Sequence, residues 1–350
     1  MKILITGGAG FIGSNFARHI LGLKKGYSVV NYDKLTYAGN LANLASIADN
    51  PNYRFVRGDI CDLAAVEAAM TGCSAVVHFA AESHVDRSIY EPGPVIETNI
   101  TGTFVLIQIA RKIGIERFVH VSTDEVYGDM LPDAFATEDS PLQPSSPYSA
   151  SKASSDMLVR SYVRTYGFPG LITRASNNYG PYQFPEKFLP LLITNALEDR
   201  PLPIYGDGKQ QRDWLHVEDH CRGIVAVLER GRIGEAYNIG GLDIEENLTM
   251  ARRVLRVTGK PETLLTSVKD RPGHDRRYAL DCTKMEKEVG WKPEIPLDEG
   301  LRRTIEWYKN NESWVRDIRA GDYRSYYEKY YDHRDSSLQA IGRSESKSSL

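Results

Sequence analysis

The chain has 350 residues, a formal net charge of −3, and ordinary globular proportions of hydrophobic (41%) and charged (25%) residues. This composition excludes a disordered chain, and the slightly acidic balance disfavours a general binder of nucleic acid or of anionic membranes. The four cysteines, Cys61, Cys73, Cys221 and Cys282, are scattered without a C-x-x-C pair, so they indicate neither a metal site nor a disulfide framework.

The N-terminal residues predict a short strand rather than a targeting segment. Lys2–Thr6 is mostly apolar but gives way at once to glycines, which leaves it too short for the apolar region of a signal peptide. No apolar run approaches the roughly 18 residues that a membrane-spanning helix needs. We therefore expect a cytoplasmic protein with no membrane partner.

The first third of the chain alternates short apolar runs with helical stretches. The runs are continuous rather than alternating in polarity, which is typical of parallel strands buried on both faces. This repeat predicts an α/β fold with a Rossmann-type doubly wound parallel sheet, which binds ligands at the carboxyl ends of its strands. The predicted strands are Lys2–Thr6, Tyr27–Asp33, Tyr53–Val56, Ala75–Ala80 and Phe118–Ser122, and the predicted helices include Ile12–Leu23, Ala64–Met70 and Thr103–Lys112.

A glycine-rich turn links the first predicted strand to the first predicted helix. Its sequence, Gly7-Gly8-Ala9-Gly10-Phe11-Ile12-Gly13, fits both G-x-G-x-x-G and G-x-x-G-x-x-G. Such glycines let the backbone approach a pyrophosphate, and the helix N-terminus offers free N–H groups to it. Asp33 ends the second strand 20 residues after Gly13, where an acid binds the adenosine ribose and repels a 2′-phosphate. The pattern predicts an NAD site; the alternative is a tight turn without a ligand.

A second acidic residue near this turn has two interpretations. Asp59 follows the third predicted strand, where it could contact the adenine. It could also cap a helix over Cys61–Met70. The sequence leaves both open.

An acidic pair follows the fifth predicted strand. Thr123-Asp124-Glu125 lies at the carboxyl end of Phe118–Ser122, beside the expected position of the nicotinamide. Two carboxyl groups there could act as general acid and general base if their surroundings separate their pKa values. The alternative is a solvated acidic turn, but the position beside a redox cofactor favours a catalytic pair.

A tyrosine and a lysine share one face of the helix that follows Pro147. Tyr148 and Lys152 are four residues apart, in a Y-x-x-x-K pattern. A phenol is a poor base at neutral pH, but an ammonium one turn away and an oxidised nicotinamide would favour its phenolate. Tyr148 could then accept a hydroxyl proton while hydride leaves the same carbon. Together with the glycine loop, this pattern resembles the extended short-chain dehydrogenase/reductase superfamily.

The pattern becomes irregular after about residue 176. Several prolines interrupt it, and helices such as Met250–Thr258 and Glu299–Lys309 alternate with short strands. We expect a smaller, mixed α/β C-terminal lobe that binds the substrate. The expected division is a Rossmann domain over residues 1–176, rejoined by about 212–230, a substrate lobe over 177–211 and 231–331, and a polar tail over 332–350.

Five motifs make the resemblance closer. Thr123–Gly128, read as TDEVYG, is similar to the signature of dTDP-glucose 4,6-dehydratases. The other four are Ala81–Ser88 (AESHVDRS), Asn177–Tyr182 (NNYGPY), Arg212–Trp214 (RDW) and Arg271–Tyr278 (RPGHDRRY). The likeness runs from Met1 to about Tyr331. Related sugar-nucleotide epimerases and decarboxylases share the glycine loop and Y-x-x-x-K but typically lack the Asp-Glu pair.

The resemblance implies a role for each residue of the catalytic group. Tyr148 would be the base for the C4 hydroxyl, with Lys152 tuning it and holding the nicotinamide ribose. Thr123 would hydrogen-bond the C4 oxygen. Asp124 would protonate the departing C6 hydroxyl, and Glu125 would remove the C5 proton. The expected reaction is dehydration of dTDP-glucose to dTDP-4-keto-6-deoxyglucose, a lyase reaction with bound NAD.

The resemblance also implies two sets of binding residues and an assembly. Basic residues in the second set suit a pyrophosphate, which arginine can bind bidentately. The family is usually a homodimer in which helices near Pro94–Ile113 and Pro147–Tyr166 form a four-helix bundle. The NAD positions are Gly7, Gly10, Phe11, Ile12, Gly13, Asp33, Lys34, Leu35, Thr36, Asp59, Ile60, Ala80, Ala81, Thr98, Tyr148, Lys152 and Asn178, and the sugar-nucleotide positions are Ser83, Thr123, Asn177, Lys187, Arg212, Asn247, Arg271 and His274.

Two other functions compete with this interpretation. A UDP-sugar 4-epimerase or decarboxylase of the same fold would not need Asp124 and Glu125. A non-catalytic NAD-binding sensor would be expected to have lost Tyr148 or Lys152, and both are present. The sequence therefore favours the dehydratase.

Overall fold

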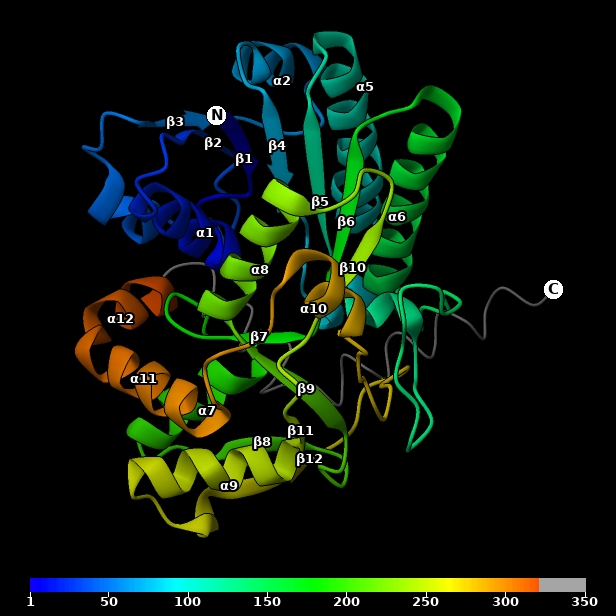
Figure 1. Ribbon diagram of the computed structural model, residues 1–350. Coiled ribbons are helices and arrows are strands. Elements are labelled where there is room, and N and C mark those ends of the chain that lie inside the picture. The colour runs from blue at the N-terminus through cyan, green and yellow to red at the C-terminus, as the bar shows by residue number, and fades with distance from the viewer. Residues whose placement is uncertain (321–350) are drawn as a thin grey trace, which may run out of the picture.

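A seven-stranded, all-parallel sheet forms the centre of the larger lobe, in a computed structural model that describes residues 1–320 (Figure 1). The strand order is β10-β6-β5-β4-β1-β2-β3. The order reverses at β1, which creates the crevice where doubly wound sheets bind their ligands. The strands are β1 (Lys2–Thr6), β2 (Ser28–Asp33), β3 (Tyr53–Arg57), β4 (Ala75–His78), β5 (Arg117–Thr123), β6 (Gly170–Ala175) and β10 (Ala236–Ile239).

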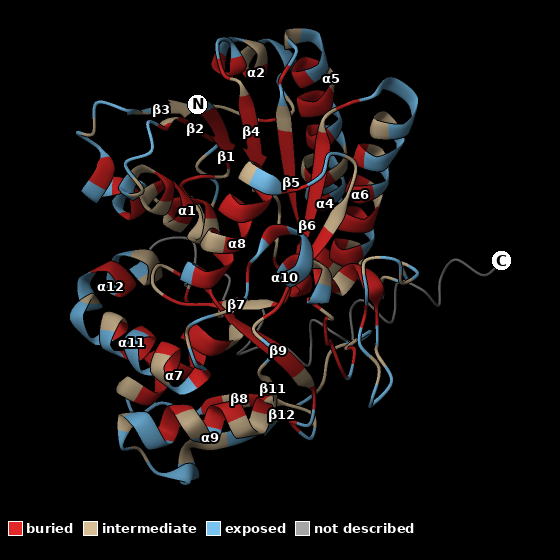
Figure 2. Cartoon of the chain, in the orientation of Figure 1, coloured by how far each residue is buried: buried red, intermediate tan, exposed pale blue. Residues whose placement is uncertain are grey.

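Helices cover both faces of this sheet, which explains why its strands are continuous apolar runs. β4 and β6 are buried along their whole length, and Figure 2 shows the central strands mostly in red, whereas β3 at the edge of the sheet has no buried residue. Two separate apolar cores lie on the two faces. One face carries α1 (Phe11–Gly22), α8 (Val217–Arg230) and α10 (Thr283–Val289), and the other carries α2 (Leu63–Met70), α5 (Thr103–Ile113) and α6 (Pro147–Tyr166).

The smaller lobe lies beyond the carboxyl ends of the strands (Figure 1). It contains a three-stranded sheet of order β11-β9-β7 and a two-stranded sheet of β12 and β8. A third apolar core holds most elements of this lobe together. They are β7 (Asn177–Tyr179), α7 (Phe188–Leu197), β8 (Leu202–Tyr205), β9 (Gln211–His216), β11 (Ile244–Glu246), α9 (Asn247–Thr258), β12 (Leu265–Val268), α11 (Leu297–Asn310) and α12 (Glu312–Ala320).

The path of the chain between the lobes differs from the expected division. β10 lies within 231–331, yet it pairs in parallel with β6 at the edge of the large sheet. α10 packs against β10 and α8, so it also belongs to the larger lobe. The stretch 212–230 is divided, because β9 joins the small sheet while α8 covers the large one. A four-residue strand is too short for its sequence pattern to reveal a partner more than 60 residues earlier.

Two further expectations concern membrane-spanning helices and the C-terminal tail. No helix within residues 1–320 is long and apolar enough to span a bilayer. The polar tail expected over 332–350, and the end of the substrate lobe expected at 331, lie outside the described residues.

Candidate active site

The glycine loop brings the backbone of three segments close together. A Cβ atom on Gly7, whose φ is +70°, would lie 2.5 Å from the Ala80 nitrogen, and one on Gly13 would lie 2.3 Å from the Gly7 oxygen. Both positions therefore exclude any side chain. Among the described residues, no side chain caps the N-terminus of α1, so its first N–H groups are available to a ligand. This geometry fits the pyrophosphate of a dinucleotide.

Asp33 ends β2 at the rim of this loop. Its Oδ2 accepts a hydrogen bond from the Ala9 N–H (2.9 Å), and its Oδ1 accepts one from the Leu35 N–H (2.8 Å). Burial raises the pKa of Asp33, while these two N–H groups oppose the rise. Each oxygen keeps a second lone pair for a ribose diol. Leu35 has a left-handed backbone (φ +59°) and packs against the apolar core, so it contributes to the site through Asp33 rather than as a cavity wall.

The two interpretations of Asp59 can now be separated. Its Oδ1 accepts a hydrogen bond from the Cys61 N–H, and its Oδ2 lies 2.6 Å from the Lys34 ammonium. The helix α2 begins later, at Leu63, and its cap is Asp62, which accepts from the Ala65 N–H. Helix capping is therefore the wrong interpretation of Asp59, which instead faces the cavity.

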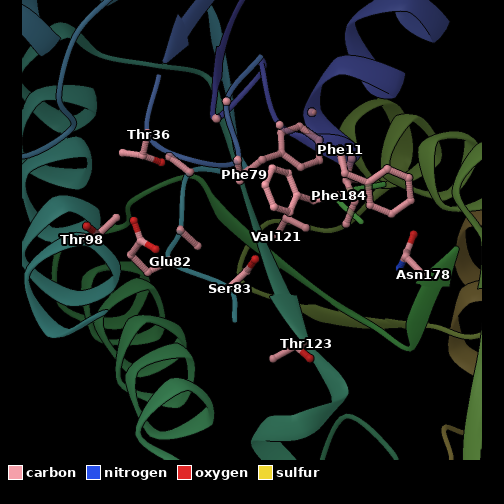
Figure 3. Close-up of a pocket in the computed structure, with 18 of the residues that line it drawn as sticks. Phe11, Thr36, Phe79, Glu82, Ser83, Thr98, Val121, Thr123, Asn178 and Phe184 are labelled. Carbon is pink, nitrogen blue, oxygen red and sulfur yellow. The ribbon is translucent and has the colours of Figure 1, made fainter. Parts of the chain in front are cut away.

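A cavity of about 300 Å³ follows the carboxyl ends of the large sheet. Figure 3 shows Phe11, Phe79 and Phe184 close together on one side of it, with Thr36 and Thr98 across from them. Sixteen of the seventeen positions expected to contact NAD line this cavity, Leu35 being the exception; they are Gly7, Gly10, Phe11, Ile12, Gly13, Asp33, Lys34, Thr36, Asp59, Ile60, Ala80, Ala81, Thr98, Tyr148, Lys152 and Asn178.

The five residues of the expected catalytic group also meet in this cavity. Thr123 ends β5, and Asp124 and Glu125 begin the 3₁₀ turn that follows it. Tyr148 and Lys152 project from the first turns of α6, which a Ser146 capping box and Pro147 start at that point. The Lys152 ammonium donates to the Val121 carbonyl at 2.8 Å, which fixes α6 against β5.

The two carboxyl groups have different surroundings. Asp124 is 3% exposed; its Oδ1 accepts from the Thr123 hydroxyl (3.1 Å), and its Oδ2 has no hydrogen-bond partner among the described residues. Burial raises the pKa of Asp124 well above its usual range, and the charges of Glu125 and Asp213 add to the rise. Burial also raises the pKa of Glu125, but there the cations Arg271, Lys187 and Arg212 oppose the rise. Asp124 is therefore suited to donate a proton and Glu125 to accept one.

The titration of Tyr148 differs from the expectation based on Lys152. Burial raises the pKa of Tyr148 far above 10, and the charges of Glu125 and Asp124 raise it further, while a hydrogen bond with Thr123 lowers it. Burial lowers the pKa of Lys152 to about 8, opposed by Asp156. The protein groups alone therefore keep Tyr148 a phenol at neutral pH, because burial, helped by the neighbouring carboxyl groups, disfavours the phenolate.

A second cavity of about 160 Å³ adjoins the first and shares Glu125, Asn177 and Lys187 with it. Three cations from different elements, Lys187, Arg212 and Arg271, face this space. All eight expected sugar-nucleotide positions line one or both cavities: Ser83 and Thr123 line the first, Arg212, Asn247, Arg271 and His274 line the second, and Asn177 and Lys187 line both.

Sequence reasoning assigned no role to several residues of these walls. Asp86 pairs with Arg271 at 2.9 Å and accepts a hydrogen bond from the Tyr205 hydroxyl at 3.1 Å, which ties the lobes together across the second cavity. Tyr37 and Glu186 line the first cavity. Asp86 lies inside the motif 81–88, so the sequence could have identified it as part of the site. No sequence pattern marks Tyr37 or Glu186.

Comparisons with known proteins agree on one family. The family model described as GDP-mannose 4,6 dehydratase matches residues 4–304. A protein of Shigella flexneri named dTDP-glucose 4,6-dehydratase is 51% identical over 361 residues, covering 95% of this chain and 100% of that protein.

Solved structures show the same likeness. The dTDP-glucose 4,6-dehydratase of Streptomyces venezuelae, crystallised with NAD and TYD bound, has a TM-score of 0.89 and 49% identity, covering 91% of this chain and 100% of the other. The UDP-glucuronic acid 4-epimerase of Bacillus cereus, in complex with UDP-glucuronic acid and NAD, has a TM-score of 0.84 and 32% identity, covering 89% and 99%.

Proposed function

The chain belongs to the dTDP-glucose 4,6-dehydratase family, and from that membership we propose that it is an NAD-dependent lyase that dehydrates dTDP-glucose to dTDP-4-keto-6-deoxyglucose. The observation that carries the proposal is the Asp124–Glu125 pair. Both side chains face the cavity that also holds Tyr148, and their surroundings favour a protonated Asp124 beside a more readily ionised Glu125. Water elimination requires such an acid and base together.

The first task of the chain is to prepare C4 of the sugar for oxidation. Thr123 would hold the C4 oxygen, and Tyr148 would accept the C4 hydroxyl proton. Bound NAD would take hydride from C4 and later return it to C6. Because burial and the two carboxylates raise the pKa of Tyr148, it needs a nearby positive charge to act as a base. Lys152, held against the Val121 carbonyl, would supply part of that charge when protonated.

The second task is the elimination itself. A C5–H bond of glucose is not acidic, but it becomes so when C4 is a ketone, and Glu125 would then remove the C5 proton. Asp124, protonated because burial raises its pKa, would donate to the C6 hydroxyl as water leaves. Positioned general acids and bases each contribute roughly 10²–10⁴ in rate.

The second cavity suits the nucleoside diphosphate of the substrate. Arg212 is held in place by the carbonyls of Gln211 and Asp275, at 2.8 and 2.9 Å, so its guanidinium is fixed in advance. Arg271 is positioned by Asp86, and Lys187 donates to the Ser83 carbonyl at 2.6 Å. Three cations fixed before binding favour a pyrophosphate, because little side-chain entropy remains to be lost.

A UDP-sugar 4-epimerase is the second candidate, because an epimerase shares this fold at 32% identity. Epimerisation needs the tyrosine and the lysine but no group that protonates a leaving C6 hydroxyl. A buried, proton-holding Asp124 would then be an unexplained cost. The observation therefore favours the dehydratase over the epimerase, and over a non-catalytic sensor.

An isotope experiment tests the proposal. dTDP-glucose deuterated at C4 should give a product that carries the deuterium at C6, and solvent deuterium should appear at C5. UDP- and GDP-sugars should be tested in parallel, with products identified by mass. Release of one NADH per sugar, or loss of the C4 label to the medium, would refute the proposal; an unchanged product mass would instead indicate the epimerase.

The assembly and division of the chain are further parts of the proposal. We propose a homodimer through α6 and the helices near 94–113, because Ile96, Phe104 and Met157 on these helices are 40–47% exposed. A cytoplasmic location fits four free cysteines. Residues 1–176 with 217–239 and 283–289 would form the NAD domain, and the other described residues would form the sugar-nucleotide lobe.

A further inference from the structure

An arginine on a short helix contacts the wall of the first cavity from behind. The guanidinium carbon of Arg87, on α3 (Val85–Tyr90), lies 3.7 Å from the centre of the Tyr37 ring. The same ring lies perpendicular to the ring of Phe184, with 5.5 Å between centres and an interplanar angle of 90°. Tyr37 is therefore held between a cation and a second aromatic ring.

A buried carboxylate completes this cluster. Oε2 of Glu186 accepts hydrogen bonds from Nη2 (2.9 Å) and Nε (3.3 Å) of Arg87, and its side chain is 1% exposed. Oε1 of Glu186 lies 3.9 Å from Nε2 of His84. Burial raises the pKa of the Tyr37 hydroxyl, and the charge of Glu186 adds to the rise. Arg87 thus joins Tyr37 and Glu186 through one guanidinium group.

The cluster joins three segments that are far apart in the sequence. Tyr37 belongs to the loop after β2, which also contains the NAD positions Lys34 and Thr36. Phe184 and Glu186 belong to the segment that leads into α7 of the smaller lobe. Tyr37, Phe184 and Glu186 line the first cavity, whereas Arg87 supports them from outside it. The loop of one lobe is thereby fastened to the other lobe beside the cavity.

We propose that Tyr37, Arg87 and Glu186 form a clasp that slows the release of the dinucleotide from the first cavity. Leaving the cavity requires the loop after β2 to separate from the segment before α7. The clasp opposes that separation through a stacked cation and a charge-assisted hydrogen bond in a buried position. Arg87 is a positioning residue, because it acts through Tyr37 and Glu186.

The reason for a slow release of the dinucleotide rests on the proposed function. In that reaction one cofactor molecule is reduced and reoxidised within a single turnover. If the reduced dinucleotide escaped in mid-cycle, the oxidised sugar intermediate could no longer receive the hydride at C6. Slow release is therefore needed by this dehydratase, whereas a dehydrogenase must exchange its cofactor at every turnover.

The test measures release of NAD directly, without any sugar. The purified protein is loaded with radiolabelled NAD, mixed with excess unlabelled NAD, and sampled over time. Tyr37→Leu removes both contacts, Tyr37→Phe keeps the ring over Arg87, and Arg87→Met removes the charge at similar side-chain length. Lys284→Met is the matched control, because the Lys284 ammonium lies over the Tyr237 ring (5.0 Å from its centre) and neither residue lines either cavity.

We expect Tyr37→Leu and Arg87→Met to release NAD about tenfold faster or more, the ratio that loss of one desolvated cation–π contact gives. Tyr37→Phe should retain most of the slow release, and Lys284→Met all of it. Activity of the two fast variants should fall on dilution and return when NAD is added. Unchanged release in Tyr37→Leu and Arg87→Met, with only a lower melting temperature at saturating NAD, would overturn the clasp. Absence of NAD binding by the unmodified protein would instead overturn the proposed function.

Discussion

Replacing Lys152 by methionine should make the fold more stable while abolishing activity. Lys152 is 3% exposed, and its ammonium donates a hydrogen bond to the Val121 carbonyl. Methionine has a similar length and no charge to desolvate. Asp156, the carboxylate one turn further along α6, would still have Arg174 at 2.8 Å as its partner. The substitution therefore removes a buried charge without leaving another one unpaired.

The magnitude follows from the pKa of the lysine. Burial lowers that pKa from 10.5 to about 8, opposed by Asp156, which corresponds to about 3 kcal/mol of destabilisation below pH 8. Loss of the hydrogen bond to Val121 offsets about 1.5–3 kcal/mol of this gain, since hydrogen bonds to charged groups contribute that much. We expect the Lys152→Met variant to be more stable at pH 7 by up to about 1.5 kcal/mol.

The pH dependence gives the sharper measurement. Between about pH 8 and 10.5 the unfolded chain binds a proton at Lys152 that the folded chain does not, so this group makes stability rise with pH across that window. Urea unfolding of both proteins, free of NAD, should be compared from pH 7 to 10.5. Other groups titrate in this range, but they are common to both proteins and cancel in the difference. The advantage of Lys152→Met should shrink as the pH rises.

Two results would refute this reasoning. A variant that is less stable at pH 7 would mean that the ammonium contributes more through its contacts than it loses by burial. A stability difference that is independent of pH would mean that the pKa of Lys152 is not lowered by the fold. Wild-type protein should be measured without cofactor, because NAD bound at Lys152 would stabilise it by mass action.

Three further predictions address the cofactor, the acid–base pair and the assembly. Asp33→Ala should weaken NAD binding and reduce the preference for NAD over NADP; equal affinity of the unmodified protein for both in a direct titration would contradict the role of Asp33. Asp124→Asn and Glu125→Gln should each lower turnover by roughly 10²–10⁴ while C4 oxidation, followed as transient absorbance of NADH, is affected less; near-normal product from either variant would show that the replaced carboxyl group is not the acid or base of the elimination. If the protein is the proposed dimer, Ile96→Asp should convert it to a monomer in sedimentation, and an unchanged dimer mass would place the interface elsewhere.

The strand–helix pattern of the first 176 residues predicted the larger lobe well, because most strands there are buried apolar runs bounded by glycine or a polar residue, β3 at the edge of the sheet being the exception. The structure supports the expected Rossmann-type fold, with strand ends shifted by a residue or two. β10 was assigned to the wrong lobe, since its pairing with β6 depends on a distant segment. Periodicity describes local burial, and it carries no information about which strand is the neighbour.

The candidate site shows the same limit at the level of single residues. Motif spacing placed Asp124, Glu125 and Tyr148 in one cavity, because the carboxyl ends of parallel strands meet at one edge. It did not foresee the direction of the Tyr148 pKa, which depends on burial and on both carboxylates. Nor did it find Tyr37 and Glu186, whose contact through Arg87 joins residues separated by about 50 and 100 positions.

The repeated passage of the chain between the two lobes has a consequence for how such proteins can be recombined. After β6 the chain enters the smaller lobe at β7, returns through α8 and β10, leaves again at β11, and returns once more for α10. A single crossover between two genes would therefore always cut through one lobe or divide its core. Exchange of sugar specificity between relatives cannot proceed by swapping one contiguous half, as it can in proteins whose domains follow each other along the chain. We expect new specificities in this architecture to arise from point substitutions in the cavity walls, and chimeras with one junction to fail to fold.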